Sequence, residues 1–132
     1  MRCSLCKKVC KKFYEPNVVK LNGKICSACK RGIKCFQKKM WRLAVLKAYG
    51  DGKCACCGEV AIEFLTLDHI DGFRCPGESK RGWGEYKFLI ENNFPYKSQF
   101  RVLCMNCNWA LGIKGYCPHK TFSTESLLHL LV

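Results

Sequence analysis

Residues 54–58 read Cys-Ala-Cys-Cys-Gly and residues 102–108 read Val-Leu-Cys-Met-Asn-Cys-Asn. Each stretch carries one Cys-x-x-Cys pair, whose two-residue spacer lets both thiolates face a single ion, and two such pairs complete a tetrahedral zinc site. The 46 residues that separate the two pairs must then fold so that the pairs meet, and we expect the functional residues within this insertion. The predicted ligands of this zinc ion are Cys54, Cys57, Cys104 and Cys107.

The same spacing occurs twice more near the amino terminus. Here 19 residues separate the pairs, within the range of roughly 15 to 20 that zinc ribbons use. An iron–sulfur cluster or a redox couple is an alternative for one pair, but neither explains four pairs on a basic chain. The predicted ligands of this second structural zinc ion are Cys3, Cys6, Cys26 and Cys29. The other cysteines are interpreted as small buried hydrophobes or spare thiols: Cys10, Cys35, Cys56, Cys75 and Cys117. Cys56 is an alternative ligand to its neighbours, but Cys54 and Cys57 are favoured because Gly58 would supply the tight turn of the pair.

Composition sets the class of protein. The chain has 132 residues and 13 cysteines, a density at which metal ions or disulfides usually supply stability. No apolar run reaches the ~20 residues of a membrane span, and the first residues lack the apolar core of a signal peptide. We therefore expect a cytoplasmic protein without membrane association, in which reduced thiols bind metal.

The positive charge is concentrated at one end of the chain. The net charge is +13, and residues 1–53 hold 15 Lys and Arg against two acidic residues, whereas the remainder is balanced. Such a patch indicates a polyanion, most simply a nucleic acid. Residues 34–50 predict a helix that ends at Gly50, with Lys34, Lys38 and Arg42 on one face, where they would contact DNA phosphates. A solvated linker helix has the same pattern.

The insertion between the second set of pairs predicts two strands and short helices. The predicted strands cover residues 61–70 and 99–103, because both stretches are rich in strand formers. Asp71-Gly72 provides a turn and residues 73–84 a loop. Helical segments are expected at 85–92, 108–111 and, with a serine cap and leucines, 123–132. The fold class is a small α+β zinc-stabilised protein.

Three polar residues of this region have the chemistry of phosphodiester hydrolysis. His69 can act as a general base near neutral pH, and Asp68 and Asn108 offer the hard oxygen ligands that Mg²⁺ prefers. Neighbouring residues on a strand point to opposite faces, so joint action of Asp68 and His69 requires a bend near Asp71. The alternatives are a hydrogen-bonded core pair for Asp68 and His69, and a helix-capping role for Asn108.

The order Cys54-x-x-Cys57-Gly58, Leu67-Asp68-His69-Ile70-Asp71-Gly72 and Cys104-x-x-Cys107-Asn108 resembles the zinc-stapled His-Asn-His (HNH) endonucleases. The similarity is greatest to the small phage-encoded branch that includes recombination endonucleases. It covers residues 54–119 well and residues 1–50 loosely. The resemblance implies a ββα-metal fold.

The resemblance also implies roles for individual residues. His69 would be the general base, and Asp68 and Asn108 would hold a catalytic Mg²⁺ or Mn²⁺. Gln99 stands where the middle asparagine of the motif is expected and would support the histidine-bearing loop. His119, in a Cys-Pro-His stretch similar to the end of the phage branch, is expected to be structural or to contact phosphate. Arg74 and Lys114 are further candidates for DNA binding.

These features predict a metal-dependent DNA endonuclease that nicks or cuts duplex or branched DNA. The predicted domains are a zinc ribbon-like DNA-binding unit (1–33), a basic linker helix (34–50), an HNH nuclease domain (51–120) and a carboxy-terminal packing helix (121–132). The competing function is a non-catalytic zinc-ribbon protein that binds nucleic acid in transcription, recombination or packaging. A homodimer would explain double-strand cutting.

Overall fold

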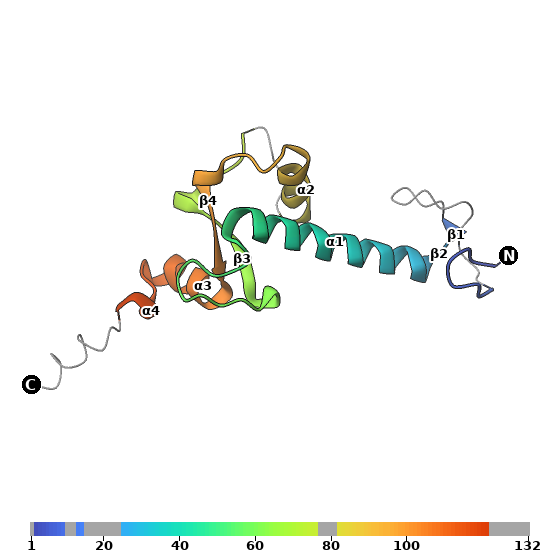
Figure 1. The fold of residues 1–132 in the computed structure, drawn as a ribbon, viewed down its shortest axis with the longest axis horizontal. Helices are drawn as coiled ribbons and strands as arrows, with labels where there is room; N and C mark the ends of the chain where they lie inside the picture. The colour runs from blue at the N-terminus through green and yellow to red at the C-terminus, as the bar shows by residue number, and fades with distance from the viewer. Residues whose placement is uncertain (1, 10–12, 15–24, 77–81, 122–132) are drawn as a thin grey trace, which may run out of the picture. The chain divides into compact units, whose positions relative to one another are not determined.

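The computed structural model describes residues 2–9, 13–14, 25–76 and 82–121 (Figure 1). The chain divides into two compact units, an N-terminal unit (Met1–Met40) and a C-terminal unit (Trp41–Val132). The division falls inside helix α1 (Ser27–Gly50). No helix in the described ranges is both long and apolar enough to cross a bilayer.

The N-terminal unit has a small core beside its cysteines. Strand β1 (Phe13–Tyr14) pairs antiparallel with β2 (Ile25–Cys26), and Asn22-Gly23, a dipeptide typical of hairpin turns, lies outside the described residues. Helix α1 begins at Ser27, seven residues before the start at residue 34 that the sequence predicted. One internal glycine, Gly32, costs only about 1 kcal/mol, so it does not stop the helix.

The C-terminal unit is built on a two-stranded hairpin. Strand β3 (Leu65–His69) runs antiparallel to β4 (Phe100–Cys104), and helix α3 (Met105–Lys114) follows β4 directly. The sequence located both strands but placed their starts too early, because the 3-10 turns Ile62–Phe64 and Lys97–Gln99 precede them.

Two short helices complete this unit. Helix α2 (Trp83–Glu91) corresponds to the helix predicted over residues 85–92. Helix α4 (Pro118–Thr121) follows α3. Of the packing helix predicted over residues 121–132, only Thr121 belongs to the described part of the chain.

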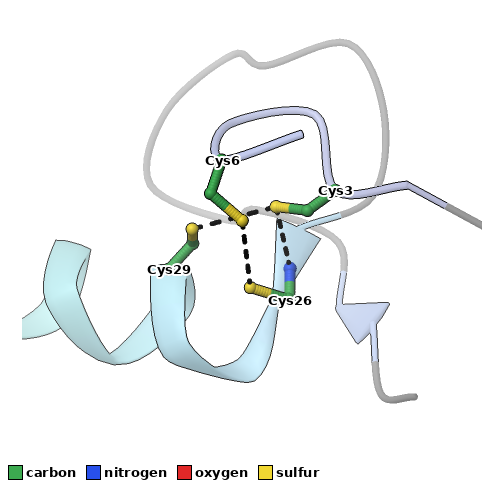
Figure 2. A group of neighbouring side chains, drawn as sticks. All are labelled: Cys3, Cys6, Cys26 and Cys29. Carbon is green, nitrogen blue, oxygen red and sulfur yellow. Dashed lines mark hydrogen bonds between the residues drawn. The ribbon is translucent and has the colours of Figure 1, made fainter. Parts of the chain in front are cut away.

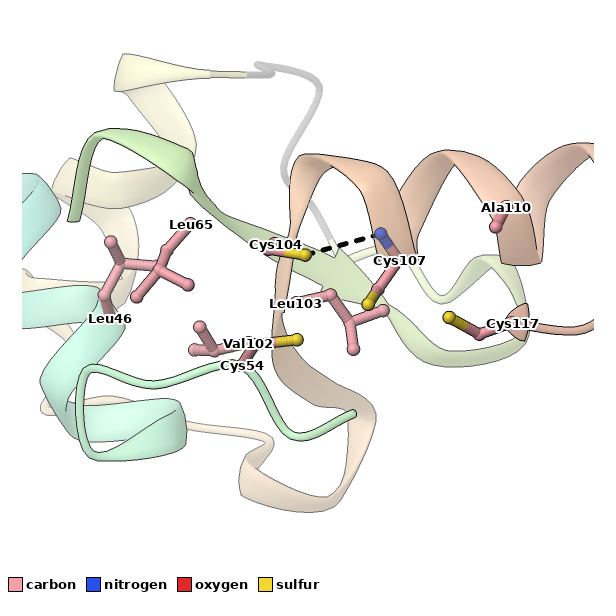
Figure 3. Packing of buried hydrophobic residues seen from close by; sticks show 9 residues of the cluster. All are labelled: Leu46, Cys54, Leu65, Val102, Leu103, Cys104, Cys107, Ala110 and Cys117. Carbon is pink, nitrogen blue, oxygen red and sulfur yellow. Dashed lines mark hydrogen bonds between the residues drawn. The ribbon is translucent and has the colours of Figure 1, made fainter. Parts of the chain in front are cut away.

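The buried residues of the C-terminal unit form two clusters along one face of β3, one at Leu65 and the other at Leu67. Helix α1 contributes to both through consecutive residues, Leu46 to the first and Val45 to the second. The first cluster (Figure 3) contains Leu46, Cys54, Leu65, Val102, Leu103, Cys104, Cys107, Ala110 and Cys117. The second contains Val45, Leu67, Cys75, Leu89 and Phe100. Cys75 is thus a small core residue, as predicted.

The end of α1 packs closely against β4. A Cβ placed on Gly50 would lie 2.5 Å from the Cβ of Val102, a separation that real side chains do not tolerate. Glycine at this position therefore lets the last turn of the helix lie against the strand, and it ends the helix where the sequence predicted.

Candidate metal centres and strand–helix site

The N-terminal cysteines converge on one point. The sulfur of Cys3 lies 3.8 Å from that of Cys29, and the sulfur of Cys6 lies 3.8 Å from that of Cys26 (Figure 2). A tetrahedral ion with Zn–S bonds of ~2.3 Å separates its sulfurs by about 3.8 Å. The four ligand atoms all lie within 4.8 Å of one another, so the predicted cluster is positioned to hold a zinc ion.

The second predicted set also converges, in the C-terminal unit. The sulfurs of Cys57 and Cys104 are 3.6 Å apart, and the backbone N–H of Cys107 donates to the sulfur of Cys104. The four ligand atoms lie within 4.8 Å of one another: Cys54, Cys57, Cys104 and Cys107. The hairpin of β3 and β4 closes the 46-residue interval by pairing Leu65 with Cys104.

The loop that carries Cys3 and Cys6 is a tight turn held by two backbone hydrogen bonds. The N–H of Cys3 donates to the carbonyl of Lys8, and the N–H of Lys7 donates to the carbonyl of Cys3, both at 3.0 Å. Lys7 has a φ of +59°, a left-handed conformation that costs a side-chain-bearing residue about 1–2 kcal/mol.

The loop that carries Cys54 and Cys57 repeats this turn. The N–H of Cys54 donates to the carbonyl of Glu59 at 2.8 Å, and the N–H of Gly58 donates to the carbonyl of Cys54 at 3.0 Å. Gly58 has a φ of +78°, which glycine adopts without strain. The glycine predicted to form the tight turn has that role, and Lys7 is its counterpart in the other unit.

The second pair of each cluster also has a common placement. Cys26 ends β2 and Cys29 is the third residue of α1, while Cys104 ends β4 and Cys107 is the third residue of α3. Both metal centres therefore combine a tight loop with the junction of a strand and a helix. This junction differs from the second hairpin loop that a zinc ribbon would place there.

Hydrogen bonds within the clusters favour ionised thiols at particular positions. Backbone donation, chiefly at Cys6, lowers the pKa of the Cys3 thiol to about 6. Burial opposes ionisation of Cys54, but hydrogen bonds with backbone groups of Cys57, Cys104 and Cys56 lower the pKa of its thiol to about 6. The neighbouring thiol of Cys26, together with burial, raises the pKa of Cys29 to about 12. A bound cation favours the thiolate at every position, because a coordinating thiol is deprotonated.

His69 is the last residue of β3 and faces α2. Its Nε2 lies 2.6 Å from Oε1 of Glu85, and its ring packs edge-on against Phe100 at a centroid distance of 5.0 Å. Glu85 is buried. A carboxylate that accepts the Nε2 proton leaves Nδ1 as the acceptor nitrogen of the ring.

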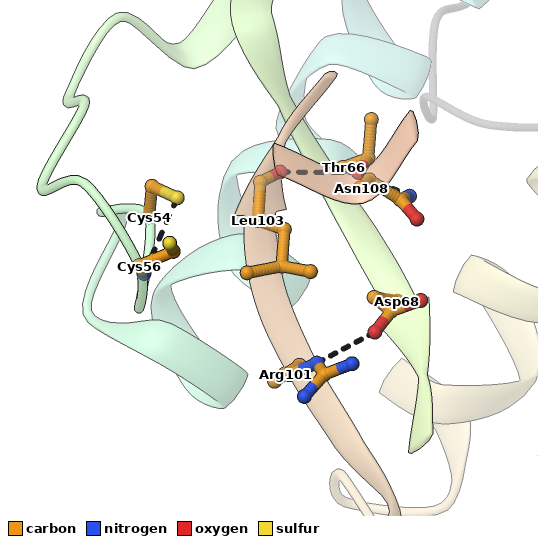
Figure 4. Close-up of polar contacts among 7 residues, drawn as sticks. All are labelled: Cys54, Cys56, Thr66, Asp68, Arg101, Leu103 and Asn108. Carbon is orange, nitrogen blue, oxygen red and sulfur yellow. Dashed lines mark hydrogen bonds and ion pairs between the residues drawn. The ribbon is translucent and has the colours of Figure 1, made fainter. Parts of the chain in front are cut away.

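Asp68 faces the opposite side of the sheet, where it forms an ion pair. The Nε of Arg101 donates to its Oδ2 at 2.6 Å, between residues that are directly opposite in the β3–β4 register (Figure 4). The Asp68 side chain is 17% exposed and that of Arg101 is 40% exposed, so the pair lies at the edge of the protein interior.

Asn108 is fixed beside the same face of β3. Its Nδ2 donates to Oγ1 of Thr66 at 2.9 Å, and that hydroxyl donates to the carbonyl of Leu103 at 3.0 Å (Figure 4). Thr66 and Asp68 are two residues apart on the strand and share a face. The hydrogen bond to Thr66 uses the amide nitrogen of Asn108. Its amide oxygen, Oδ1, is the atom that a hard cation would bind.

The structure therefore brings Asp68 and Asn108 to one face of the hairpin and directs His69 to the other. The bend considered for Asp68 and His69 comes only after the strand, at Asp71, which has a φ of +52°. Gln99 lies in the turn just before β4, next to Phe100, the residue paired with His69. It was predicted as the first residue of the strand.

The predicted DNA-contacting residues have different surroundings. Lys34 and Lys38 are exposed in the N-terminal unit, and Arg74 and Lys114 are exposed in the C-terminal unit. Arg42, in contrast, is half-buried, and its NH2 group lies within 3.2 Å of three backbone carbonyl oxygens, those of Ile62, Glu63 and Leu65. These contacts give Arg42 a structural role, because the guanidinium fastens the start of β3 to α1 instead of facing solvent phosphate.

Two features of the site were missed from the sequence. Glu85 is 16 residues from His69 and lies on another element, so no local pattern connects them. Another group of ligand atoms within 4.8 Å of one another contains Cys56, Cys107, Cys117 and His119. The sequence assigned no metal-binding set to Cys56 and Cys117. The signal that could have found them is the number of cysteines, because five remain beyond the two predicted clusters.

Comparison of the chain with protein-family models, curated proteins and solved structures finds no match.

Proposed function

We propose that the C-terminal unit is a metal-dependent DNA endonuclease of the HNH type. The observation that supports this best is the placement of Asp68 and Asn108 on one face of a strand–strand–helix unit, with His69 at the end of the same strand. A four-cysteine cluster links the loop before the hairpin to the strand–helix junction after it. These elements occur in the order β3, β4, α3 that a ββα-metal site requires.

The donor set fits a hard divalent cation, Mg²⁺ or Mn²⁺. The carboxylate of Asp68 and Oδ1 of Asn108 would hold it, leaving further positions for water and a phosphate oxygen. Such a cation would stabilise negative charge on the phosphate and the leaving oxygen.

His69 would act as the general base. The carboxylate of Glu85 would accept a hydrogen bond from Nε2–H, so that Nδ1 would be the atom that takes a proton from the attacking water. Because His69 is the last residue of β3, a scissile phosphate beyond the end of the strand would be accessible from both faces of the sheet. The hydrolytic chemistry would therefore take place at the strand end and not over either face.

The charge distribution supports DNA as the partner. Residues 1–53 carry all of the excess positive charge, and phosphate contacts from Lys and Arg supply sequence-independent affinity. Lys34, Lys38, Arg74 and Lys114 are the exposed candidates for such contacts. Arg101 joins them, since a guanidinium paired through Nε still presents its two terminal nitrogens to a phosphate.

One observation favours the competing function, a non-catalytic zinc protein that binds nucleic acid. The carboxylate of Asp68 already has a cationic partner, Arg101, at 2.6 Å. If that pair persists when DNA binds, Asp68 is not a metal ligand and the same surface only recognises phosphates. Both functions give salt-sensitive binding, but only the nuclease gives turnover.

Cleavage of supercoiled plasmid separates the two functions. We expect the full chain to nick plasmid in the presence of Mg²⁺ or Mn²⁺, and His69→Ala to reduce the rate by about 10²- to 10⁴-fold. Lys87→Ala, an exposed change on α2, is the matched control and should cleave like the wild type. Binding without cleavage by the wild type would favour the non-catalytic function, and equal cleavage by His69→Ala would remove His69 as the base.

A further inference from the structure

A histidine and three cysteines form another convergent set in the C-terminal unit. Nδ1 of His119 lies 3.2 Å from the sulfur of Cys107 and 3.4 Å from that of Cys117. Cys56 completes the set, whose ligand atoms all lie within 4.8 Å of one another. These residues come from the loop before the hairpin, from α3 and from the start of α4.

The separations suit a tetrahedral metal ion. Zinc bonds of ~2.3 Å to sulfur and ~2.05 Å to nitrogen place a ligand sulfur and a ligand nitrogen about 3.6 Å apart. The two sulfur–nitrogen distances are within a few tenths of an ångström of that value. Three cysteines with one histidine are also one of the common donor sets of structural zinc.

Cys107 belongs to both cysteine sets of this unit. Its side chain is completely buried, and its sulfur interacts with the thiols of Cys104 and Cys57 from one set and of Cys117 and Cys56 from the other. Figure 3 shows this sulfur between those of Cys104 and Cys117. A thiolate sulfur has more than one lone pair, so it can bind two cations at once.

We propose that the C-terminal unit binds two zinc ions bridged by the thiolate of Cys107. Cys54, Cys57 and Cys104 complete the shell of the first ion. Cys56, Cys117 and Nδ1 of His119 complete the shell of the second. The proposal is independent of nuclease activity, because none of these ligands is Asp68, His69 or Asn108.

The charge balance of the pair is favourable. One divalent ion with four thiolates has a net charge of −2, and two divalent ions with six thiolates and a neutral imidazole have the same net charge. The second ion therefore ionises Cys56 and Cys117 without adding net charge to the interior.

The second ion would connect the carboxy-terminal side of the domain to its first loop. Cys117 and His119 flank the start of α4, and Cys56 lies between the two loop ligands of the first ion. Each set has one exposed ligand, Cys57 in the first and His119 in the second.

Metal counting on the full chain tests the number of ions. We expect native mass spectrometry to find three zinc ions per chain, one of them in the N-terminal cluster, and one ion fewer in His119→Gln and in Cys117→Ser. Cys35→Ser, which changes an exposed cysteine outside the three clusters, is the matched control and should retain three. Two ions in the wild type and an unchanged count in His119→Gln would overturn the proposal.

The bridge is tested on the wild type alone, so the result does not depend on how a variant folds. With ¹¹³Cd in place of zinc, two of the cadmium resonances should split each other through the shared sulfur. X-ray absorption of the zinc form should show a metal–metal separation below about 4.6 Å, twice the Zn–S bond. Three cadmium resonances without mutual splitting would overturn the bridge.

Discussion

Glu85 and His69 form a 2.6 Å contact that joins α2 to the end of β3. Glu85 is buried, and the histidine ring is further held by its T-shaped packing against Phe100. A charge kept in the interior usually has a specific partner, because burial of an unpaired carboxylate is costly. The pair fixes both the orientation of the ring and the nitrogen that faces away from the carboxylate.

Glu85→Gln tests whether this contact positions a base. The neutral amide still reaches His69, but it can donate as well as accept and so no longer requires the proton of the ring to be on Nε2. We therefore expect the maximal rate of plasmid nicking to fall roughly 10- to 100-fold. The affinity for DNA, measured by fluorescence anisotropy, should not change, because Glu85 is away from solvent. Glu91→Gln on the exposed face of α2 is the control. Equal losses of rate and DNA affinity would indicate a structural role only.

Arg101→Ala should destabilise the C-terminal unit by about 1–3 kcal/mol, since it leaves the mostly buried carboxylate of Asp68 without its donor. Urea unfolding followed by circular dichroism measures the change. Lys87→Ala breaks the 3.6 Å pair with Glu91, whose partners are both more than half exposed, and should cost at most about 1 kcal/mol. Equal effects of the two substitutions would show that the Asp68–Arg101 pair has no special contribution.

Gly50→Ala places a methyl group against Val102, at a Cβ separation of 2.5 Å. We expect the free energy of unfolding to fall by about 1–3 kcal/mol, because strand and helix must separate to make room. Gly112→Ala, in α3 with open space around the new Cβ, should instead stabilise by up to about 1 kcal/mol. A thermal melt of each variant distinguishes these opposite signs, and stabilisation by Gly50→Ala would contradict the packing described for this end of α1.

Lys7→Gly should stabilise the loop that carries Cys3 and Cys6 by about 1 kcal/mol, because glycine adopts the left-handed conformation of Lys7 without strain. Competition with a chromophoric chelator should show tighter zinc binding. Lys8→Gly removes the same charge at the neighbouring position and is not expected to tighten binding. In the C-terminal loop the reverse change, Gly58→Ala, meets no neighbouring atom and should weaken binding by about 1–2 kcal/mol through backbone strain alone.

If the cysteine clusters hold zinc, its removal should unfold both units. Binding free energies of structural zinc are about 10–16 kcal/mol, far above what the three buried residues at the centre of the N-terminal core supply. Strong chelation should therefore abolish the far-ultraviolet circular dichroism of the folded chain, and zinc should restore it. A spectrum that is unchanged after all metal has been removed would show that the clusters are dispensable for folding.

Local rules account for what the sequence predicted correctly. The two-residue spacing within each cysteine pair is a short-range constraint, so the ligand sets could be assigned without knowledge of the fold. The strand formers around Leu65 and Val102 located the hairpin, and Gly50 marked the end of α1. Boundaries were less accurate, because Gly32 does not interrupt α1 and 3-10 turns precede both strands.

Long-range contacts account for what the sequence did not reveal. Arg42 has the spacing of a basic helix face, yet its partners are carbonyl groups about 20 residues away. The contact of His69 with Glu85 depends on how α2 folds back on the hairpin. The position of Cys107 between two sets of ligands becomes visible only when α3 and α4 are placed beside the first loop.

Four of the nine residues in the first hydrophobic cluster are cysteines: Cys54, Cys104, Cys107 and Cys117. The hydrophobic interior and the candidate metal centre therefore share residues, so a newly made chain without zinc would lack the ion that ties these four positions of the interior together. The amount of folded protein in a cell would then follow the supply of zinc. Zinc starvation would lower the level of this protein, because the unfolded chain would be degraded.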